Sequence, residues 1–578
     1  MAFDVVASSR QEQARTTPWR HAVRTGLALG GVNVYIAVVG ILMMFQGRAI
    51  VVNTLTLGYA TLALTMFLAG LAVSRRGLFA DPGRIVLGGM AAGLLAAALP
   101  AALAVAMSLV ELRFIFVALN AQLLTMLTFH QQPALLGIVY LLVLGIAMGG
   151  LGALFVMIGD RVRRPLAGGI IVAGIAGILQ ELIRPILANS PVTKPLHDLL
   201  YTWTGLTLRG AIVISVVVAL GILLWQLNRG RVETSLSTLT PSTRRHIRWG
   251  YIGAAALLIA LFPLFAGNFV GQVLLMVGLF TLMGMGLNLE VGLAGLLDLG
   301  FVAFYAVGAY TTALLTADSP FAIAQLSFWQ AMPIAVFISI VVGVIFGIPV
   351  LKIRGDYLAV ATLALGEIVR VVVLSNAAAP WLGGAAGVLQ IPRPQIGAMV
   401  LATPVELFYL TLAASLVAAY VAWRLAESRL GRAWTAIRDD EDVAEALGIN
   451  LIQVKLLAYG LGAAFAGLAG SIFAVMLGSI FPHSFQLIIS INILALIIVG
   501  GLGSLPGVAV GALVLIGLPE MLREFGEFRY LFYGLAIIAV MRLKPEGLWP
   551  SAAKQRELAI DAETVAVQQA AVAEHKAP

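Results

Sequence analysis

The chain has 578 residues, of which 60% are hydrophobic and 11% charged, and its formal net charge is +8. A soluble domain carries about 25% charged residues, so this composition indicates an integral membrane protein. The chain has no cysteine, and its six His residues form no HExxH pattern, so we expect no disulfide and no bound metal. Its Lys and Arg residues cluster beside apolar runs, which is typical of cytoplasmic loops and not of nucleic-acid-binding surfaces.

The first half of the chain predicts an N-terminal membrane domain of unknown role over residues 25–227, after a basic, cytoplasmic segment 1–24 that precedes a retained anchor. The stretch 113–128 either spans the membrane or lies at its surface, and both interpretations stay open. The apolar runs are 25–45, 51–73, 85–110, 134–158, 166–187 and 210–227. The basic clusters contain Arg75, Arg76, Arg84, Arg161, Arg163, Arg164, Arg229, Arg231, Arg244 and Arg245.

A Ser/Thr-rich polar stretch, 228–248, predicts a cytoplasmic linker between two membrane domains. Counting spans of roughly 20 residues gives about sixteen in an all-α, polytopic fold. Lys352, Arg354, the loop 424–453 and a disordered tail, 551–578, then all lie in the cytoplasm. The apolar runs of the second half are 249–266, 269–287, 291–316, 329–351, 357–375, 405–425, 454–478, 486–503, 506–521 and 529–543.

The segment 286–310, GLNLEVGLAGLLDLGFVAFYAVGAY, places Asn288, Glu290 and Asp298 inside apolar sequence with glycines between them. Acidic groups at membrane depth usually face a cavity or a partner, and glycines allow a broken or re-entrant backbone there. A wet turn at one membrane face is the alternative, and both interpretations stay open. The three residues are candidates for a translocation pathway.

The segment 352–376, KIRGDYLAVATLALGEIVRVVVLSN, predicts a helix whose N-cap is Asp356. Glu367 follows about 16 Å further along the helix, near mid-membrane. Arg370 comes three residues later on the same face, so we expect an ion pair that faces the protein interior or a transport path. A purely structural pair is the alternative. Asp356, Glu367 and Arg370 are further pathway candidates.

The longest charged stretch between spans is 426–450, AESRLGRAWTAIRDDEDVAEALGIN. Its second part begins with acids and continues with helix formers, which predicts a short helix ending at Gly448. Such a helix between two spans is suited to dock into a partner's groove, whereas the alternative is an ordinary solvated loop. The candidate coupling residues are Asp439, Asp440, Glu441, Asp442, Ala444, Glu445, Ala446 and Gly448.

Two glycine-rich stretches predict backbone features and no ligand site. The run VGGLGSLPG at 499–507 must break a helix, and it is not a GxGxxG motif. Small residues at 460, 464, 467 and 469 predict close helix packing. The chain also contains no GxxxxGK[ST], so it does not itself carry the common phosphate-binding loop.

The motifs at 286–310, 349–370, 428–450 and 500–507 follow one another in the order and spacing of the branched-chain amino-acid ABC permeases. They resemble most the LivM-type subunit. The resemblance covers about residues 250–550, so 249–550 is interpreted as a LivM-like permease domain. This chain departs from the family at 382–387, where it reads LGGAAG in place of a TGGPNG-like loop. Residues 1–240 carry no resemblance.

The resemblance implies an all-α ABC importer permease bundle in a bacterial-type cytoplasmic (inner) membrane, and a transporter subunit, not an enzyme. The implied partners are two ABC ATPase subunits, a second permease subunit and an extracytoplasmic substrate-binding protein, with no nucleic acid. ATP and Mg²⁺ are expected on the ATPase subunits alone, and 426–450 is expected to carry the coupling helix. The substrate stays open between leucine-type amino acids, other small amino acids, urea and short amides.

Two other functions compete with this reading. A secondary transporter would use an ion gradient through Glu290, Asp298 or Glu367, but it would need no charged coupling loop. A membrane enzyme acting on a lipid-linked substrate would need catalytic groups gathered at one membrane face, and the sequence offers only scattered acids.

Overall fold

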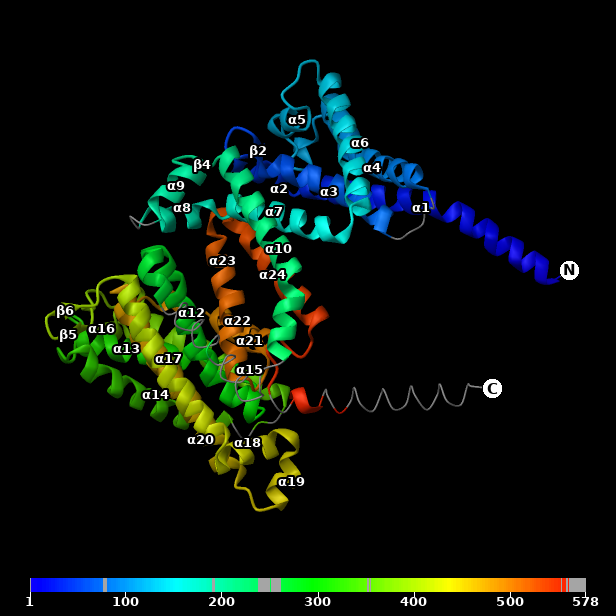
Figure 1. Cartoon of the computed structure of the whole chain (residues 1–578). Helices are drawn as coiled ribbons and strands as arrows, with labels where there is room; N and C mark the ends of the chain where they lie inside the picture. The colour runs from blue at the N-terminus through cyan, green and yellow to red at the C-terminus, as the bar shows by residue number, and fades with distance from the viewer. Residues whose placement is uncertain are drawn as a thin grey trace. The chain divides into compact units, whose positions relative to one another are not determined.

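The computed structural model describes residues 2–75, 79, 81–189, 193–237, 250, 261–350, 353, 355–551, 554–557 and 560. The described chain is mainly helical, and it divides into two compact units, Met1–Leu258 and Ile259–Pro578 (Figure 1). Its strands are confined to three two-stranded antiparallel hairpins. The predicted all-α, polytopic class is therefore confirmed.

The first unit is a helical bundle in which α4 packs against α1, α3 and α6. The contact between α4 and α6 is backbone to backbone, because a Cβ atom at Gly93 or Gly149 would overlap the opposite main chain. The elements are α1 (Ala2–Val38), α2 (Ile41–Gln46), β1 (Ala49–Val51), β2 (Leu55–Thr56), α3 (Leu57–Arg75), α4 (Pro82–Leu109), η1 (Leu112–Phe114), α5 (Ala121–Leu127), α6 (Ala134–Met157), α7 (Asp160–Ile178), α8 (Gln180–Ala188), α9 (Lys194–Leu200), β3 (Tyr201–Thr202), β4 (Gly205–Leu206) and α10 (Leu208–Ser237).

The second unit is built around the long helix α20, which packs against α12, α13 and α14. The elements are α12 (Asn268–Leu287), η2 (Asn288–Leu293), α13 (Val302–Thr316), α14 (Phe328–Val350), α15 (Asp356–Leu374), α16 (Ala379–Leu382), η3 (Gly384–Ala386), β5 (Gln395–Ile396), β6 (Met399–Val400), α17 (Pro404–Ala426), α18 (Arg429–Asp439), α19 (Glu441–Ala446), α20 (Leu451–Leu477), η4 (Pro482–Ser484), α21 (Leu487–Gly500), α22 (Leu505–Ala512), η5 (Leu513–Gly517), α23 (Leu518–Met521), η6 (Arg523–Phe528) and α24 (Arg529–Leu543).

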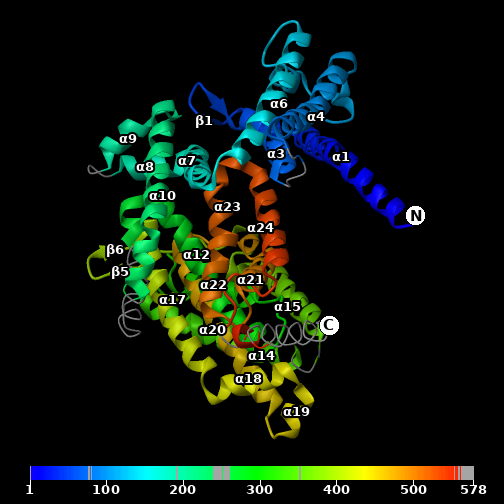
Figure 2. The same cartoon turned by 45° about the vertical axis from the view of Figure 1, so that its right-hand side comes forward.

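Small residues bring α20 close to its neighbours, as the sequence predicts. A Cβ atom at Gly470 would overlap the carbonyl of Tyr305 on α13, and one at Gly467 would overlap Ser339 on α14. The predicted helix break at 499–507 is also confirmed, since α21 ends at Gly500 and α22 begins at Leu505. Away from this core, α18 and α19 project from one end of the unit in both views (Figure 2).

Ten helices of the described residues are long and apolar enough to cross a membrane, and α7 with α8 adds an eleventh if this pair, bent by 82°, counts as one span. The predicted number of about sixteen is not confirmed. Several predicted runs are shorter helices, among them α13 and the Leu505–Met521 segment. The stretch 113–128 contains only the one-turn η1 and the seven-residue α5.

Some predictions fall outside the described residues. They include most of the run 249–266, the second half of the linker 228–248 and most of the tail 551–578. In the part of the linker that is described, α10 continues as a helix to Ser237. The basic residues Arg76, Arg244, Arg245, Lys352 and Arg354 also lie outside the described part.

Candidate functional site

The first polar centre lies where α12 ends. A wide, π-helical turn, η2, follows α12 and carries Asn288 and Glu290, and Asp298 stands in the connection to α13. All three side chains are at most 1% exposed. The alternative of a wet turn at the membrane face is therefore wrong, because these groups are enclosed by protein.

The neighbours of this centre come from distant parts of the chain. The amide oxygen of Asn288 accepts a hydrogen bond of 2.8 Å from the backbone N–H of Gly503, in the break between α21 and α22. Asp298 accepts one of 2.6 Å from the N–H of Gly300. The Glu290 carboxyl lies directly against Gly462 of α20, where any Cβ atom would overlap Oε1. The centre therefore joins α12, α20 and the α21–α22 break.

Four oxygen atoms of this centre receive no hydrogen bond from the described residues. They are both carboxyl oxygens of Glu290, Oδ2 of Asp298 and the hydroxyl of Tyr459, a buried residue of α20. Unpaired buried polar atoms are rare in folded proteins. These polar atoms therefore gather at the end of α12, where η2 contacts α18.

The second polar centre is the ion pair on α15. Nε of Arg370 donates to the two carboxyl oxygens of Glu367 at 3.1 and 3.0 Å, which confirms the predicted pairing. The Arg370 side chain is 26% exposed and the Glu367 side chain 45%. If α15 spans the membrane, as its length and composition allow, this pair lies at membrane depth, where lipid is an unfavourable neighbour for charge. Protein or water is therefore expected to cover it.

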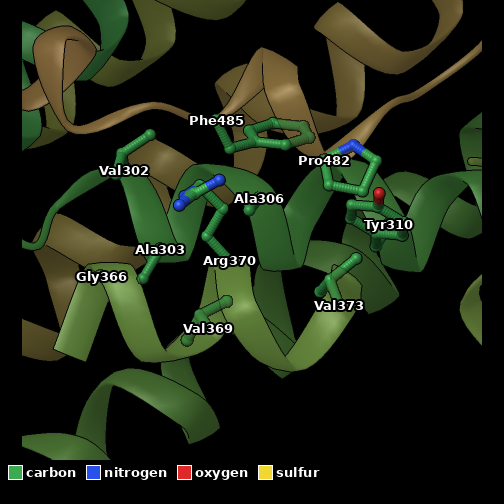
Figure 3. A pocket seen from close by; sticks show the side chains of 10 residues that line it. All are labelled: Val302, Ala303, Ala306, Tyr310, Gly366, Val369, Arg370, Val373, Pro482 and Phe485. Carbon is green, nitrogen blue, oxygen red and sulfur yellow. The ribbon is translucent and has the colours of Figure 1, made fainter. Parts of the chain in front are cut away.

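A narrow crevice lies beside Arg370, whose side chain extends from α15 toward α13 (Figure 3). Its volume is about 10 Å³, room for about one water molecule, so the crevice is closed to an amino acid in this conformation. The lining residues are Val302, Ala303, Ala306, Tyr310, Gly366, Val369, Arg370, Val373, Pro482 and Phe485.

The start of α15 corrects a detail of the sequence analysis. Asp356 is the first residue of the helix, and the N-cap position belongs to Gly355, whose φ is +63°. Glycine adopts a positive φ without strain, so Gly355 and not Asp356 occupies the position before the first turn of the helix. The Asp356 side chain lies outside the described structure.

The charged segment 426–450 forms two short helices, α18 and α19, joined at Asp440. Asp440 caps α19, since its carboxylate accepts from the backbone N–H groups of Asp442 and Val443 at 3.0 Å each. The helix ends before Gly448, which has a φ of +85°. The predicted short helix with an acidic start and a glycine stop is therefore confirmed.

The face of α19 open to a partner differs from the one expected. Ala444 is 1% exposed, so it packs inside the chain and offers no docking surface. The exposed apolar side chains are those of Val443 and Leu447, at 54% and 76%. The remaining candidates Asp439, Asp442, Glu445, Ala446 and Gly448 are exposed, whereas Glu441 is half-buried.

Three residues that the sequence analysis missed attach this segment to the membrane helices. The indole N–H of the buried Trp434 donates to the carbonyl of Val454 at 2.9 Å. Nη1 of Arg438 donates to the carbonyl of Gly292, in η2, at 2.7 Å. Nζ of Lys455, a 5% exposed residue, pairs with Glu441 at 2.6 Å.

These contacts tie α18 and α19 to two different elements, η2 and α20. The two short helices are thus attached both to the turn that carries part of the first polar centre and to the central helix of the bundle. A sequence signal existed for Lys455 alone, as an isolated cation at the start of an apolar run. The partners of Trp434 and Arg438 are distant in sequence, so no local pattern indicated them.

Comparison with known proteins identifies the family. The model of the family described as branched-chain amino acid transport system / permease component matches residues 269–541. The high-affinity branched-chain amino acid transport system permease protein LivM of Salmonella typhimurium is 36% identical over 303 residues, which cover 48% of this chain and 70% of the relative. LivM of Escherichia coli matches with the same identity and coverage.

A further relative is the high-affinity branched-chain amino acid transport system permease protein LivH of Escherichia coli, 32% identical over 124 residues that cover 21% of this chain and 40% of LivH. No solved structure gives a significant match. The family match falls on the second unit, which holds both polar centres and the α18–α19 segment. The chain thus belongs to the branched-chain amino acid ABC transporter permeases, of the LivM type.

Proposed function

We propose that this permease forms part of the translocation pathway of an ATP-driven importer for branched-chain or related small amino acids, in a bacterial-type inner membrane. Two separate ATPase subunits drive it, and an extracytoplasmic binding protein delivers the substrate. The chain has no chemistry of its own to perform. Its task is to alternate the access of a pathway between the two sides of the membrane.

The observation that carries this proposal is the attachment of α18 and α19 to the membrane helices. Val443 and Leu447 present an apolar surface to the cytoplasm in the predicted orientation, suited to a groove on an ATPase subunit. In the same segment, Arg438 connects to η2, and Glu441 connects to Lys455 of α20. Closure of the ATPase subunits would therefore tilt the elements that enclose the first polar centre.

The second permease subunit is expected to cover α15. Its face around Val360, Ile368 and Val371 is more than half exposed, and the Glu367–Arg370 pair lies beside it. Lipid would leave this pair poorly solvated, whereas a second helical subunit or a water-filled path between the subunits would not. A pathway between the two permease subunits places Glu367 and Arg370 at its wall.

Uptake by a reconstituted complex tests the proposal. The full chain is combined with its ATPase, second permease and binding protein partners in liposomes, and radiolabelled leucine is supplied outside. We expect accumulation that requires ATP and binding protein together and is insensitive to collapse of the proton and sodium gradients. Uptake that follows an ion gradient without ATP would show a secondary transporter instead.

A further inference from the structure

A cavity of about 380 Å³ opens at one end of the second unit, between α12, α21, α23 and α24. Gln272, near the start of α12, and Arg529, at the start of α24, both line it. In the orientation predicted from the Lys and Arg clusters, both helices run from the outside toward the cytoplasm, so the cavity lies at the extracytoplasmic end. The volume lies in the range of about 300 to 1,000 Å³ that is usual for small-molecule sites. The cavity is thus on the side from which an importer receives its solute.

The cavity combines an apolar wall with a few polar groups, as small-molecule sites do. Met276 and Phe280 of α12 and Leu515 of η5 form the apolar wall. Asn492 and Tyr533 line it as well. Their side chains are hydrogen-bonded to each other, since the hydroxyl of Tyr533 donates to the Asn492 amide oxygen at 3.0 Å.

The charged groups of the cavity are one carboxylate and one guanidinium. Oε2 of Glu520 lies 3.6 Å from Nη1 of Arg529, and the side chains keep 29% and 24% of their surface exposed. A tight charge-assisted hydrogen bond measures about 2.7–2.9 Å, so this pair is loose. Nη2 of Arg529 also donates to the hydroxyl of Tyr530 at 3.2 Å, and the remaining N–H groups of the guanidinium can bind a further ligand. Arg523 approaches Glu520 from outside the cavity lining at 3.5 Å.

We propose that this cavity is a receiving site for the transported solute, and that the solute is a zwitterionic α-amino acid with an apolar side chain. Its carboxylate binds Arg529, its ammonium group binds Glu520, and its side chain lies against Met276, Phe280 and Leu515. This assignment rests on the proposed function, which makes the chain part of an amino-acid importer.

Charge complementarity selects this ligand over the others that the sequence leaves open. A simple carboxylic acid would bring its charge close to Glu520, and a simple amine would bring its charge close to Arg529. Urea and short amides carry no charge for either group and no side chain for the apolar wall. A zwitterionic phospholipid headgroup has the same pair of charges, so the experiment must separate it from an amino acid.

Ligand-detected NMR on the purified full chain, in detergent free of phospholipid, measures binding directly. The probes are leucine, its deaminated acid 4-methylpentanoate and its decarboxylated amine 3-methylbutylamine. We expect only leucine to bind, and Glu520→Gln and Arg529→Gln each to weaken its binding at least about tenfold, the loss of one charge-assisted hydrogen bond. The control is Arg542→Gln, an exposed change at the other end of α24, which leaves binding unaltered.

Three results would overturn the assignment: leucine binding that both variants retain, equal binding of leucine and the deaminated acid, or displacement of leucine by micromolar phosphatidylethanolamine, which would assign the site to lipid. If Arg529→Gln fails to fold, Arg529→Lys is tested in its place. This variant keeps the charge but loses the forked donor group that suits a carboxylate, so the binding of leucine must still fall. Uptake by the reconstituted complex separates the two proposals. A wild-type complex that transports no amino acid refutes the proposed function, whereas full uptake by both variants refutes the site alone.

Discussion

The pair of Lys455 and Glu441 gives the sharpest quantitative test of how the cytoplasmic segment is held. Lys455 has a 6% exposed side chain, whereas the Glu441 side chain is 29% exposed. Removing one partner of a buried pair costs about 3–5 kcal/mol, because the other charge stays buried without compensation. The unequal burial therefore predicts unequal effects for the two single changes.

Glu441→Gln leaves the buried ammonium of Lys455 without its carboxylate. We therefore expect the free energy of unfolding to fall by about 3 kcal/mol, the lower end of this range. Lys455→Met removes the buried charge and leaves Glu441 able to turn toward water, so we expect about 1 kcal/mol. The double variant should lie close to Lys455→Met, because no buried charge remains. Asp439→Asn is the matched control, since its pair with Arg438 is exposed, and it should cost less than about 0.5 kcal/mol.

The assay is reversible unfolding of the purified full chain in mixed micelles of increasing denaturing detergent, followed by the fluorescence of its tryptophans. Substrate-stimulated ATP hydrolysis by the assembled complex is measured on the same variants. Glu441→Gln should lower both the stability and the stimulation. Equal, additive losses for the two single variants would refute the reasoning, because they would show that the pair is not buried as the structure describes.

Three further predictions concern the other sites. Glu367→Gln and Arg370→Gln should each impair uptake, with a smaller combined loss in a double-mutant cycle, and strict additivity would argue against the pair. Gly462→Ala should destabilise the chain by about 1–3 kcal/mol in the same micelle unfolding assay, since its Cβ overlaps the Glu290 carboxyl, and unchanged stability would contradict this packing. Val443→Asp and Leu447→Asp should lower uptake and stimulated ATP hydrolysis together without affecting membrane insertion, and full coupling in both would exclude this surface as the docking face.

Local features of the second unit could be predicted from the sequence because local physics decides them. An acidic start and Gly448 define α19, the glycines at 501 and 503 break the helix, and an i, i+3 spacing brings Glu367 to Arg370. These relations depend on residues within one or two turns of each other, so the chain around them has little influence on the outcome.

Features that depend on distant contacts could not be predicted in this way. The burial of Glu290 depends on Gly462, and the position of α18 depends on the carbonyl of Gly292. The burial of Ala444 is a further case, because the sequence of α19 does not show which of its faces packs inward. The number of spans could not be fixed from the sequence either, because apolar composition does not distinguish a spanning helix from a short or bent one such as α8.

The central claim is that an ATPase subunit engages the exposed apolar face of α19, and cross-linking tests it most directly. The chain has no cysteine of its own, so Val443→Cys introduces a single thiol. In the assembled, transport-competent complex we expect this thiol to cross-link to a cysteine in the groove of an ATPase subunit and to abolish uptake until the link is reduced. The control is Ser319→Cys, in the connection between α13 and α14, which should form no such link. Active complexes in which position 443 forms no cross-link to the groove cysteine would contradict the account.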